Sequence, residues 1–350
     1  MNPPGRPSAG DDRWVERLGG LIDRFSGTRV AVIGDLIADE FIYGQLSRVS
    51  REAPVLILKY DRTTILPGGA GNAAGNVAAL GGHARLVARV GRRDVDRRLV
   101  RALAKGVDRG GLVRPAQYRT PVKTRILAGG LHSARQQIVR IDRESEVVPD
   151  ARTRQAFERA ARRAVTGCDA VLVSDYGSGL ITPALVAGLR ARLRRSGRRR
   201  GVPLLIDSRY DLLRYRGMTA CTPNESEVEQ MLEVPIGDDT RRLERAGRTL
   251  LKRTRARGLV ITRGGRGMAV FVPGQRPEHI PIYGTDEVAD VTGAGDTVIG
   301  TLTVALAAGA SFYAAARLAN YAAGLVVMKR GTAIVGADEL RQAVASDTAA

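Results

Sequence analysis

The residues with the clearest chemical potential form the stretch Asp-Val-Thr-Gly-Ala-Gly-Asp at 290–296, which leads into a long uncharged run. A glycine-containing loop that opens into an apolar helix presents unpaired backbone N–H groups at the positive end of the helix dipole. Gly293, Ala294 and Gly295 can therefore form a cradle for a phosphate. Asp296 follows directly, where a carboxylate could take a proton from an attacking hydroxyl. A tight turn before a buried helix remains the alternative, since short glycine-rich matches are weakly specific.

Two carboxylates follow the first apolar strand. The run from Thr28 to Ile33 is continuously apolar apart from its start, as expected for a buried parallel strand, and it ends at Gly34 and Asp35. Ligands in open α/β sheets bind beyond the carboxyl ends of the strands, where Asp35 and Asp39 stand. Either carboxylate could instead be a turn or cap residue.

A second glycine-rich stretch contains Gly68, Gly69 and Asn72 and leads into a helix that ends at Gly81 and Gly82. A backbone of this kind suits close approach to a hydroxylated ligand, although small residues also serve tight packing of a helix on a sheet. The stretch is no P-loop, because a Gly-Lys-Ser/Thr sequence occurs nowhere in the chain.

Short alternating segments predict an antiparallel β lid inserted into the α/β pattern at about 41–67 and 113–142. The segments lie at 40–43, 55–60, 63–66, 120–127 and 136–142, together with Val113. Lys123 and Arg140 would direct cations at a ligand from this lid, although each alone is more often a solvated strand residue.

From about residue 149 the chain alternates regularly between helices and strands. Helices are predicted at 150–165, 183–195 and 241–255, with strands at 170–174, 203–206, 259–262 and 268–272. The apolar run after 296 predicts two buried helices, 298–308 and 312–328, divided by Gly309 and Ser311. We therefore expect a doubly wound, mostly parallel sheet in one domain at 28–345, preceded at 1–27 by a tail and a short helix at 13–26.

Composition narrows the function classes. The chain has 350 residues and a formal net charge of +19, supplied mostly by Arg. Basic residues are scattered among acidic ones and aromatic residues make up only 4%, so we expect no nucleic-acid partner. The division of the apolar run excludes a membrane span, and we expect no membrane partner. Cys168 and Cys221 stand far apart, which favours a reducing cytosol over a disulfide framework.

Several of these motifs occur together and in order. They are Gly34-Asp35 with Asp39, the stretch at 67–72, Thr222-Pro223-Asn224-Glu225-Ser226-Glu227, Thr262-Arg263-Gly264 and the stretch at 290–296. Over about residues 28–345 the chain resembles the ribokinase-like, PfkB-type carbohydrate kinases. The resemblance implies a ribokinase-like fold, ATP and Mg²⁺ as cofactors, a monovalent cation as a further candidate, and a homodimer formed through the β lid.

The resemblance also implies a role for each motif. Asp296 would be the base, and Gly293 to Gly295 the anion hole. The nucleotide and its metal would lie against Asn224, Glu225, Ser226, Glu227, Thr262, Arg263, Gly264 and Asn320, with Asn224 and Glu227 reaching Mg²⁺ through water. Asp35, Gly69 and Asn72 would hold sugar hydroxyls. The other residues that we expect to contact the sugar or its phosphate are Asp39, Arg48, Gly68, Lys123, Arg140, Asp207 and Arg209.

Finer features resemble one branch, the D-glycero-β-D-manno-heptose 7-phosphate kinases, which phosphorylate the anomeric O1 to give the 1,7-bisphosphate on the route to ADP-heptose. These features are the segments at 47–55, 174–176, 205–207, 214–217 and 296–300. Two positions depart from the branch, because Ser178 and Arg209 stand where it usually has Lys. A kinase for another sugar or sugar phosphate therefore remains open, as does a catalytically silent kinase fold used for binding.

Overall fold

The computed structural model describes residues 12–129, 136–145, 147–195, 201–284, 290–329 and 331–347. Within them, the central layer is a nine-stranded sheet in the order β13-β12-β11-β10-β9-β8-β1-β4-β5. Its strands are β1 (Arg29–Gly34), β4 (His83–Arg89), β5 (Val107–Val113), β8 (Ala170–Asp175), β9 (Leu204–Ser208), β10 (Ala220–Cys221), β11 (Gly258–Thr262), β12 (Met268–Phe271) and β13 (Glu278–Ile280). Neighbouring strands are parallel, except that β12 runs antiparallel to β11 and β13. The predicted doubly wound sheet is confirmed.

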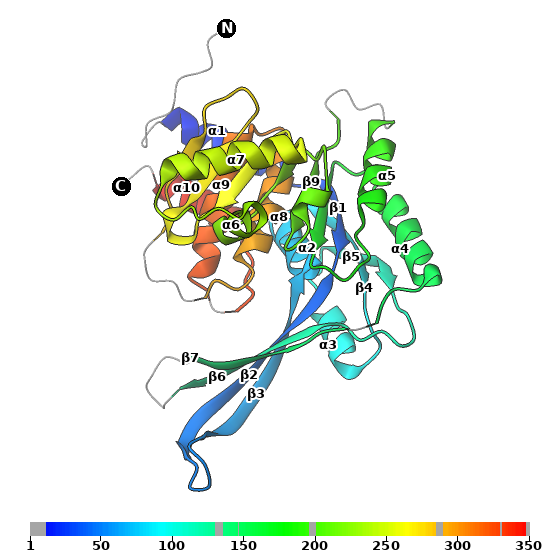
Figure 1. Cartoon of the computed structure of the whole chain (residues 1–350), viewed down its shortest axis with the longest axis vertical. Helices are drawn as coiled ribbons and strands as arrows, with labels where there is room; N and C mark the ends of the chain where they lie inside the picture. Colours follow the sequence, from blue (N-terminus) through cyan, green and yellow to red (C-terminus); the bar gives the residue numbers. More distant parts are fainter. Residues whose placement is uncertain are drawn as a thin grey trace.

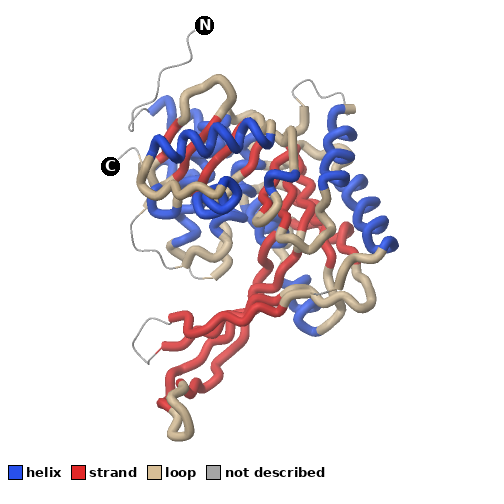
Figure 2. Tube along the Cα trace, viewed as in Figure 1, coloured by secondary structure: helices blue, strands red, loops and turns tan. Residues whose placement is uncertain are grey.

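Helices cover both faces of this sheet (Figures 1 and 2). One face carries α1 (Asp12–Asp23), α2 (Ala70–Ala79), α3 (Asp94–Ala102), α8 (Ala294–Ala307), α9 (Phe312–Val327) and α10 (Ala337–Ser346). The other carries α4 (Ala151–Ala164), α5 (Pro183–Arg194), α6 (Glu225–Leu232) and α7 (Thr240–Thr254). Short 3₁₀ helices lie at η1 (Leu212–Arg214) and η2 (Gly264–Arg266). Because alternate residues of β1 point into two different cores, the strand reads as an unbroken apolar run.

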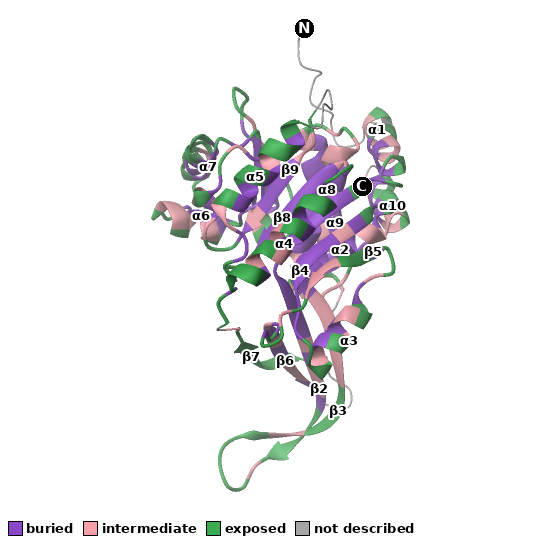
Figure 3. Ribbon diagram, turned by 90° about the vertical axis from the view of Figure 1, so that its right-hand side faces the viewer, coloured by how far each residue is buried: buried purple, intermediate pink, exposed green. Residues whose placement is uncertain are grey.

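A second sheet, in the order β3-β2-β6-β7, forms a long ribbon that projects from the body (Figure 1). Its strands are β2 (Leu36–Val49), β3 (Leu56–Gly69), β6 (Val122–Gly129) and β7 (Gln136–Arg143). Two antiparallel hairpins, β2/β3 and β6/β7, are joined by a parallel pairing of β2 with β6, a detail that the sequence did not predict. The outer part of β2 and β3 is exposed (Figure 3).

Two details of the predicted lid are wrong. Val113 ends β5, which pairs with β4 in the central sheet and takes no part in the lid. The strand is difficult to predict from the sequence because Gly110 and Gly111 interrupt its apolar pattern. Glycine is needed at 111, since a Cβ there would come within 2.5 Å of the Leu86 carbonyl oxygen. The segments at 40–43, 55–60 and 63–66 also belong to two continuous strands, since β2 follows β1 almost directly and runs on into the lid.

The two helices after the glycine-rich stretch divide as predicted, but the first of them begins earlier. Gly309 has a φ of +90°, and the Ser311 side chain caps α9 by accepting from the Ala314 N–H. Within the described residues, no helix is both long and apolar enough to cross a membrane. α8 begins at Ala294 rather than at 298, because Gly293 adopts a left-handed conformation and acts as its N-cap. Asp296 therefore lies in the first turn of the helix and not in the loop before it.

The N-terminal helix α1 packs into the main body. Leu18 of α1 and Phe25, just after its end, are fully buried in the same hydrophobic core as α2 and α8, and α1 contacts α10. Neither α10 nor β13 was predicted from the sequence.

Candidate active site

A cavity of about 560 Å³ lies between the carboxyl ends of the central strands, the N-terminus of α8 and the base of the lid. It brings together residues that are far apart in the chain. The predicted site residues that line it are Asp39, Gly69, Lys123, Arg140, Asp207, Arg209, Asn224, Glu227, Thr262, Gly264, Gly293, Ala294, Gly295, Asp296 and Asn320. The predicted site residues Asp35, Arg48, Gly68, Asn72, Glu225, Ser226 and Arg263 are not part of its lining.

The N-terminus of α8 opens into the cavity. Its N-cap, Gly293, has a φ of +82°, and within the described part of the chain no side chain caps this end of the helix. A Cβ on Gly295 would meet nothing within 4 Å, so the backbone here borders open space. The Asp290 carboxylate holds the preceding loop in place by accepting from the N–H groups of Thr292 (2.9 Å) and Gly331 (3.0 Å). An uncapped helix N-terminus of this kind suits an anion.

Asp296 lies next to this opening and is only 4% exposed. Its Oδ2 accepts from Asn72 Nδ2 at 3.0 Å, and its Oδ1 accepts from the Tyr176 hydroxyl at 3.2 Å. Burial raises the pKa of Asp296 to about 7, and the nearby Asp39 carboxylate adds to the rise, while both hydrogen bonds oppose it. A carboxylate with a pKa in this range is suited to accept a proton near neutral pH.

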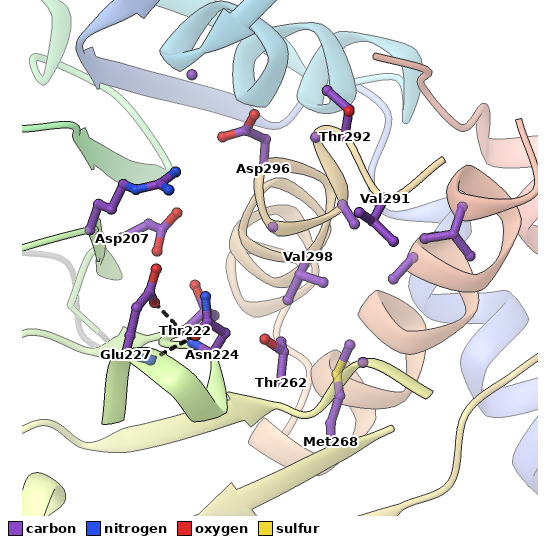
Figure 4. Close-up of a pocket in the computed structure, with 18 of the residues that line it drawn as sticks. Asp207, Thr222, Asn224, Glu227, Thr262, Met268, Val291, Thr292, Asp296 and Val298 are labelled. Atoms are coloured by element: carbon purple, nitrogen blue, oxygen red, sulfur yellow. Dashed lines mark hydrogen bonds between the residues drawn. The ribbon is translucent and has the colours of Figure 1, made fainter. Parts of the chain in front are cut away.

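The wall that faces Asp296 carries Asp207 and Glu227 (Figure 4). Burial raises the pKa of Asp207 well above its usual range, and the charges of Asp296 and Glu227 act in the same direction. Asn224 and Glu227 also form a capping box on α6: the Glu227 N–H donates to Asn224 Oδ1, and the Asn224 N–H donates to Glu227 Oε2. The spacing of this motif therefore has a structural cause as well as the predicted functional one.

Four cations line the end of the cavity nearest the lid: Lys123 and Arg125 of β6, Arg140 of β7 and Arg209 after β9. Burial lowers the pKa of Lys123, and the positive charge of Arg209 contributes. Lys123 Nζ lies 5.7 Å from the centre of the Tyr176 ring. Arg140 pairs with the Asp142 carboxylate at 2.9 and 3.0 Å.

An apolar slot extends from the helix N-terminus on the side away from the lid. It is lined by Met268, Ile282, Val291, Ala323 and Val327. The Asn320 side chain borders this slot and donates from Nδ2 to the Pro281 carbonyl oxygen at 2.9 Å. Apolar walls with one oriented amide suit a planar heterocyclic base.

Two residues predicted to lie against the nucleotide pair with each other. Arg263 Nε contacts Glu225 Oε2 at 2.6 Å, and both side chains are almost fully buried. Arg266 also pairs with Glu225 and with Asp238. This cluster ties the start of α6 to the turn after β11, leaving Thr262 and Gly264 as the cavity-lining residues of their motif.

Asp35 and Arg48 also lie apart from the cavity lining. Asp35 Oδ2 accepts from the N–H groups of Tyr176 (2.8 Å) and Ser178 (3.3 Å), and its Oδ1 accepts from the Ser178 hydroxyl. Its carboxylate thus fixes the loop after β8, and it uses the serine that departs from the branch pattern. Arg48 is exposed in the outer part of the lid.

Tyr176, which contacts Asp296 directly, was not among the predicted site residues, nor was Arg125, which pairs with Asp39 at 2.6 Å. Tyr176 could have been found by the rule that selected Asp35, because it follows the carboxyl end of β8. Asn72 was predicted to hold a sugar hydroxyl, whereas here its amide contacts Asp296 and the Gly293 carbonyl.

Comparison with models of protein families identifies the family of this chain. Residues 28–339 match the model of the pfkB family carbohydrate kinases. The chain belongs to this family. The predicted resemblance and the predicted enzyme class are therefore confirmed at the level of a carbohydrate kinase.

Among curated relatives, the chain is 40% identical over 322 residues to the bifunctional protein HldE of Desulfatibacillum aliphaticivorans, covering 91% of this chain and 64% of the relative. It is 42% identical over 313 residues to HldE of Geobacter sulfurreducens, covering 88% and 61%. The chain thus spans less than two thirds of the length of these relatives.

Solved structures show the same fold at low sequence identity. Arabidopsis thaliana ribokinase, complexed with ribose and ATP, superposes with a TM-score of 0.68 and 19% identity, over 91% of this chain and 99% of that one. Escherichia coli phosphofructokinase-2 in complex with potassium gives a TM-score of 0.71 and 16% identity, over 92% and 99%.

Proposed function

We propose that the protein transfers the terminal phosphoryl group of ATP to the anomeric O1 of D-glycero-β-D-manno-heptose 7-phosphate. The observation that carries this proposal is the position of Asp296, a buried carboxylate beside the uncapped N-terminus of α8 and at the wall of a cavity whose other end is cationic. The similarity to bifunctional HldE proteins supports the choice of sugar.

Asp296 acts as the general base. In its ionised form it accepts the proton of the attacking sugar hydroxyl, while the Asn72 amide and the Tyr176 hydroxyl fix the orientation of its carboxylate. Backbone N–H groups in the first turn of α8 stabilise negative charge on the phosphoryl group in transit. General-base catalysis of this kind contributes roughly 10²–10⁴-fold in rate.

The residues present fit ATP and Mg²⁺. The apolar slot beside Asn320 takes the base, the N-terminus of α8 takes the phosphates, and Glu227 and Asn224 face the same space. ATP supplies the phosphoryl group, and Mg²⁺ neutralises the charge of the phosphates. Within the described residues, no group of three or more His, Cys, Asp or Glu side chains could hold a metal directly. In line with the family resemblance, we infer that Asn224 and Glu227 act on the metal through water.

The cations at the lid end would hold the phosphate that the acceptor already carries. Lys123, Arg140 and Arg209 come from three separate elements and line the same end of the cavity. Charge-assisted hydrogen bonds to phosphate are among the stronger polar contacts, and Arg can make them in pairs. An unphosphorylated sugar would offer these cations no anion to bind.

The experiment is a panel of sugars and sugar phosphates, each assayed with ATP and Mg²⁺, with the product position read by phosphorus NMR. We expect the heptose 7-phosphate to give the highest kcat/KM and a new anomeric phosphate signal. Preference for another phosphorylated or an unphosphorylated sugar would overturn the choice of substrate and leave the carbohydrate kinase. Absence of turnover across the panel would favour the silent binding protein.

We also propose a homodimer through the lid. The lid exposes several large apolar side chains on β2, β3 and β7 and in the turn between β2 and β3, namely Leu46, Val49, Val55, Leu56, Tyr60, Ile138, Val139 and Ile141. Apolar surface of this extent on one projecting sheet is typical of an interface. Light scattering should give twice the mass of one chain, and Leu46→Lys with Ile141→Lys should halve it; a monomeric parent would overturn the proposal.

A further inference from the structure

Asn76 lies one helical turn after Asn72 on α2, inside the body of the protein and away from the cavity lining. It is 1% exposed. Its Nδ2 donates to the backbone oxygen of Asn72 at 3.0 Å and to Asn72 Oδ1 at 3.2 Å. Asn76 therefore contacts the very side chain that contacts Asp296.

The orientation of the Asn72 amide follows from its neighbours. Its Nδ2 lies 3.0 Å from Asp296 Oδ2 and 3.2 Å from the Gly293 carbonyl oxygen, which are both acceptors. Only the NH₂ side of an amide can satisfy two acceptors. Asn72 Oδ1 must then point the other way, toward Asn76, where it needs a donor.

Asn76 supplies that donor, but the orientation this requires is unfavourable for its own amide oxygen. Both Asn72 atoms that it contacts are acceptors, so its own Nδ2 must face them. Its Oδ1 is left buried, and among the residues that the structure describes it has no hydrogen-bond partner. Burying an unpaired amide oxygen is unfavourable. An apolar side chain of similar volume would avoid this cost, so stability alone does not account for an amide here.

We propose that Asn76 is a positioning residue for phosphoryl transfer: its amide holds Asn72 in the one orientation that donates to Asp296. The inference rests on the proposed role of Asp296 as the base. Without Asn76, Asn72 Oδ1 would lose its donor, and only the two acceptors on the Nδ2 side, Asp296 Oδ2 and the Gly293 carbonyl oxygen, would hold the amide in place. A less firmly held Asn72 would weaken the hydrogen bond to the ionised base.

Other groups also act on Asp296, and they come from different elements. They are Asp39 of β2, Lys123 of β6, Tyr176 after β8 and Asp207 of β9. A substitution at Asn76 alters none of these side chains. A change in the titration of Asp296 in such a variant would therefore reflect the lost contact between the Asn76 and Asn72 amides.

The test is a carbon-13 NMR titration of the aspartate carboxyl groups in the full chain, for the parent and for Asn76→Leu. The Asp296 signal is assigned by its loss in Asp296→Asn. Because a hydrogen bond to the ionised form lowers a carboxyl pKa, we expect the Asp296 midpoint to rise by about half a unit to one unit in Asn76→Leu. Asn76→Ala, which is smaller, should show the same shift if the leucine variant folds poorly.

Val77→Ala is the matched control, because Val77 is fully buried on the same helix but makes no polar contact with the site. It should lower the melting temperature and leave the Asp296 midpoint in place. Superimposable titrations of the parent and both Asn76 variants would overturn the inference, as would an equal shift in Val77→Ala. The titration needs no substrate, so a parent without sugar kinase activity would overturn the proposed function without obscuring this result.

Discussion

The two ends of the cavity are built in different ways. At the α8 end, Asp296, Asn72 and Gly293 are buried or half-buried and are fixed by hydrogen bonds between residues more than 200 positions apart in the chain. At the lid end, Lys123, Arg140 and Arg209 are long cationic side chains on a projecting sheet and an exposed loop. A preorganised end suits the chemical step, and an adaptable end suits recognition of a particular acceptor. Substitutions at the two ends should therefore affect different kinetic constants.

The largest effect is expected from Asp296→Asn, which should lower kcat by roughly 10²–10⁴-fold because the base is lost. ATP binding should survive, since the N-terminus of α8 is unchanged. Steady-state kinetics and ATP calorimetry measure the two effects. Asp338→Asn, at an exposed position on α10, is the control. A folded Asp296→Asn variant with kcat within a few-fold of the parent would contradict the assignment.

Asp296 also links activity to stability. Its folded-state pKa of about 7 lies above the usual 3.8, so the folded protein binds more protons than the unfolded chain between these values. The stability contributed by the neutral carboxyl is fully present below about pH 4 and is lost as the pH rises through about 7. Asp296→Asn should thus melt higher than the parent at pH 8, with a smaller difference at pH 5. An equal melting temperature at pH 8 would argue against a buried charge.

The lid end is tested by Arg209→Ala. It should raise KM for the sugar phosphate by about ten-fold, equivalent to about 1.4 kcal/mol if KM follows binding, and should barely change KM for ATP. Arg214→Ala is the control, because Arg214 is exposed nearby, pairs with Asp211 and does not line the cavity. If the affinity for ATP falls instead, Arg209 binds the nucleotide and not the sugar phosphate.

A smaller effect is expected from Asn224→Ala combined with Glu227→Ala. The variant should need several-fold more Mg²⁺ for half-maximal turnover, with KM for the sugar nearly unchanged. It also loses the cap of α6, which costs about 1 kcal/mol of stability. Asp239→Ala removes the cap of α7, where the carboxylate accepts from two backbone N–H groups. If Asp239→Ala changes the Mg²⁺ requirement equally, the effect arises from the loss of a helix cap and not from the loss of a metal contact.

The sequence predicted which residues form the α8 end of the cavity better than it predicted which residues they contact. Gly293 to Asp296 could be located because glycines that open into an apolar helix suit an anion, and because the other motifs occur in order with this stretch. The partners of Asp296 could not, since Asn72 and Tyr176 meet it only through the pairing of distant strands and helices. The capping box of Asn224 and Glu227 and the pairing of Glu225 with Arg263 show a second limit. A motif gives residue types, but it does not say which of them bind one another.

The lid was harder to predict for a physical reason. Strands that are exposed on much of their surface lack a continuous apolar run, so β2 and β3 read as short separate segments. Val113 was placed in the lid because Gly110 and Gly111 interrupt β5. By contrast, β1 and β8 are buried on both faces, and their predicted bounds agree with the structure to within a residue.

The most direct test of the central claim is the pH dependence of the phosphoryl-transfer step, measured by rapid quench in a single turnover with saturating ATP and sugar phosphate. If Asp296 is the base, the rate constant should fall about ten-fold per pH unit on the acidic side of a midpoint near its pKa of about 7. In Asp296→Asn this limb should vanish along with most of the rate. A parent rate constant that stays level from about pH 5.5 to 8.5 would contradict the account.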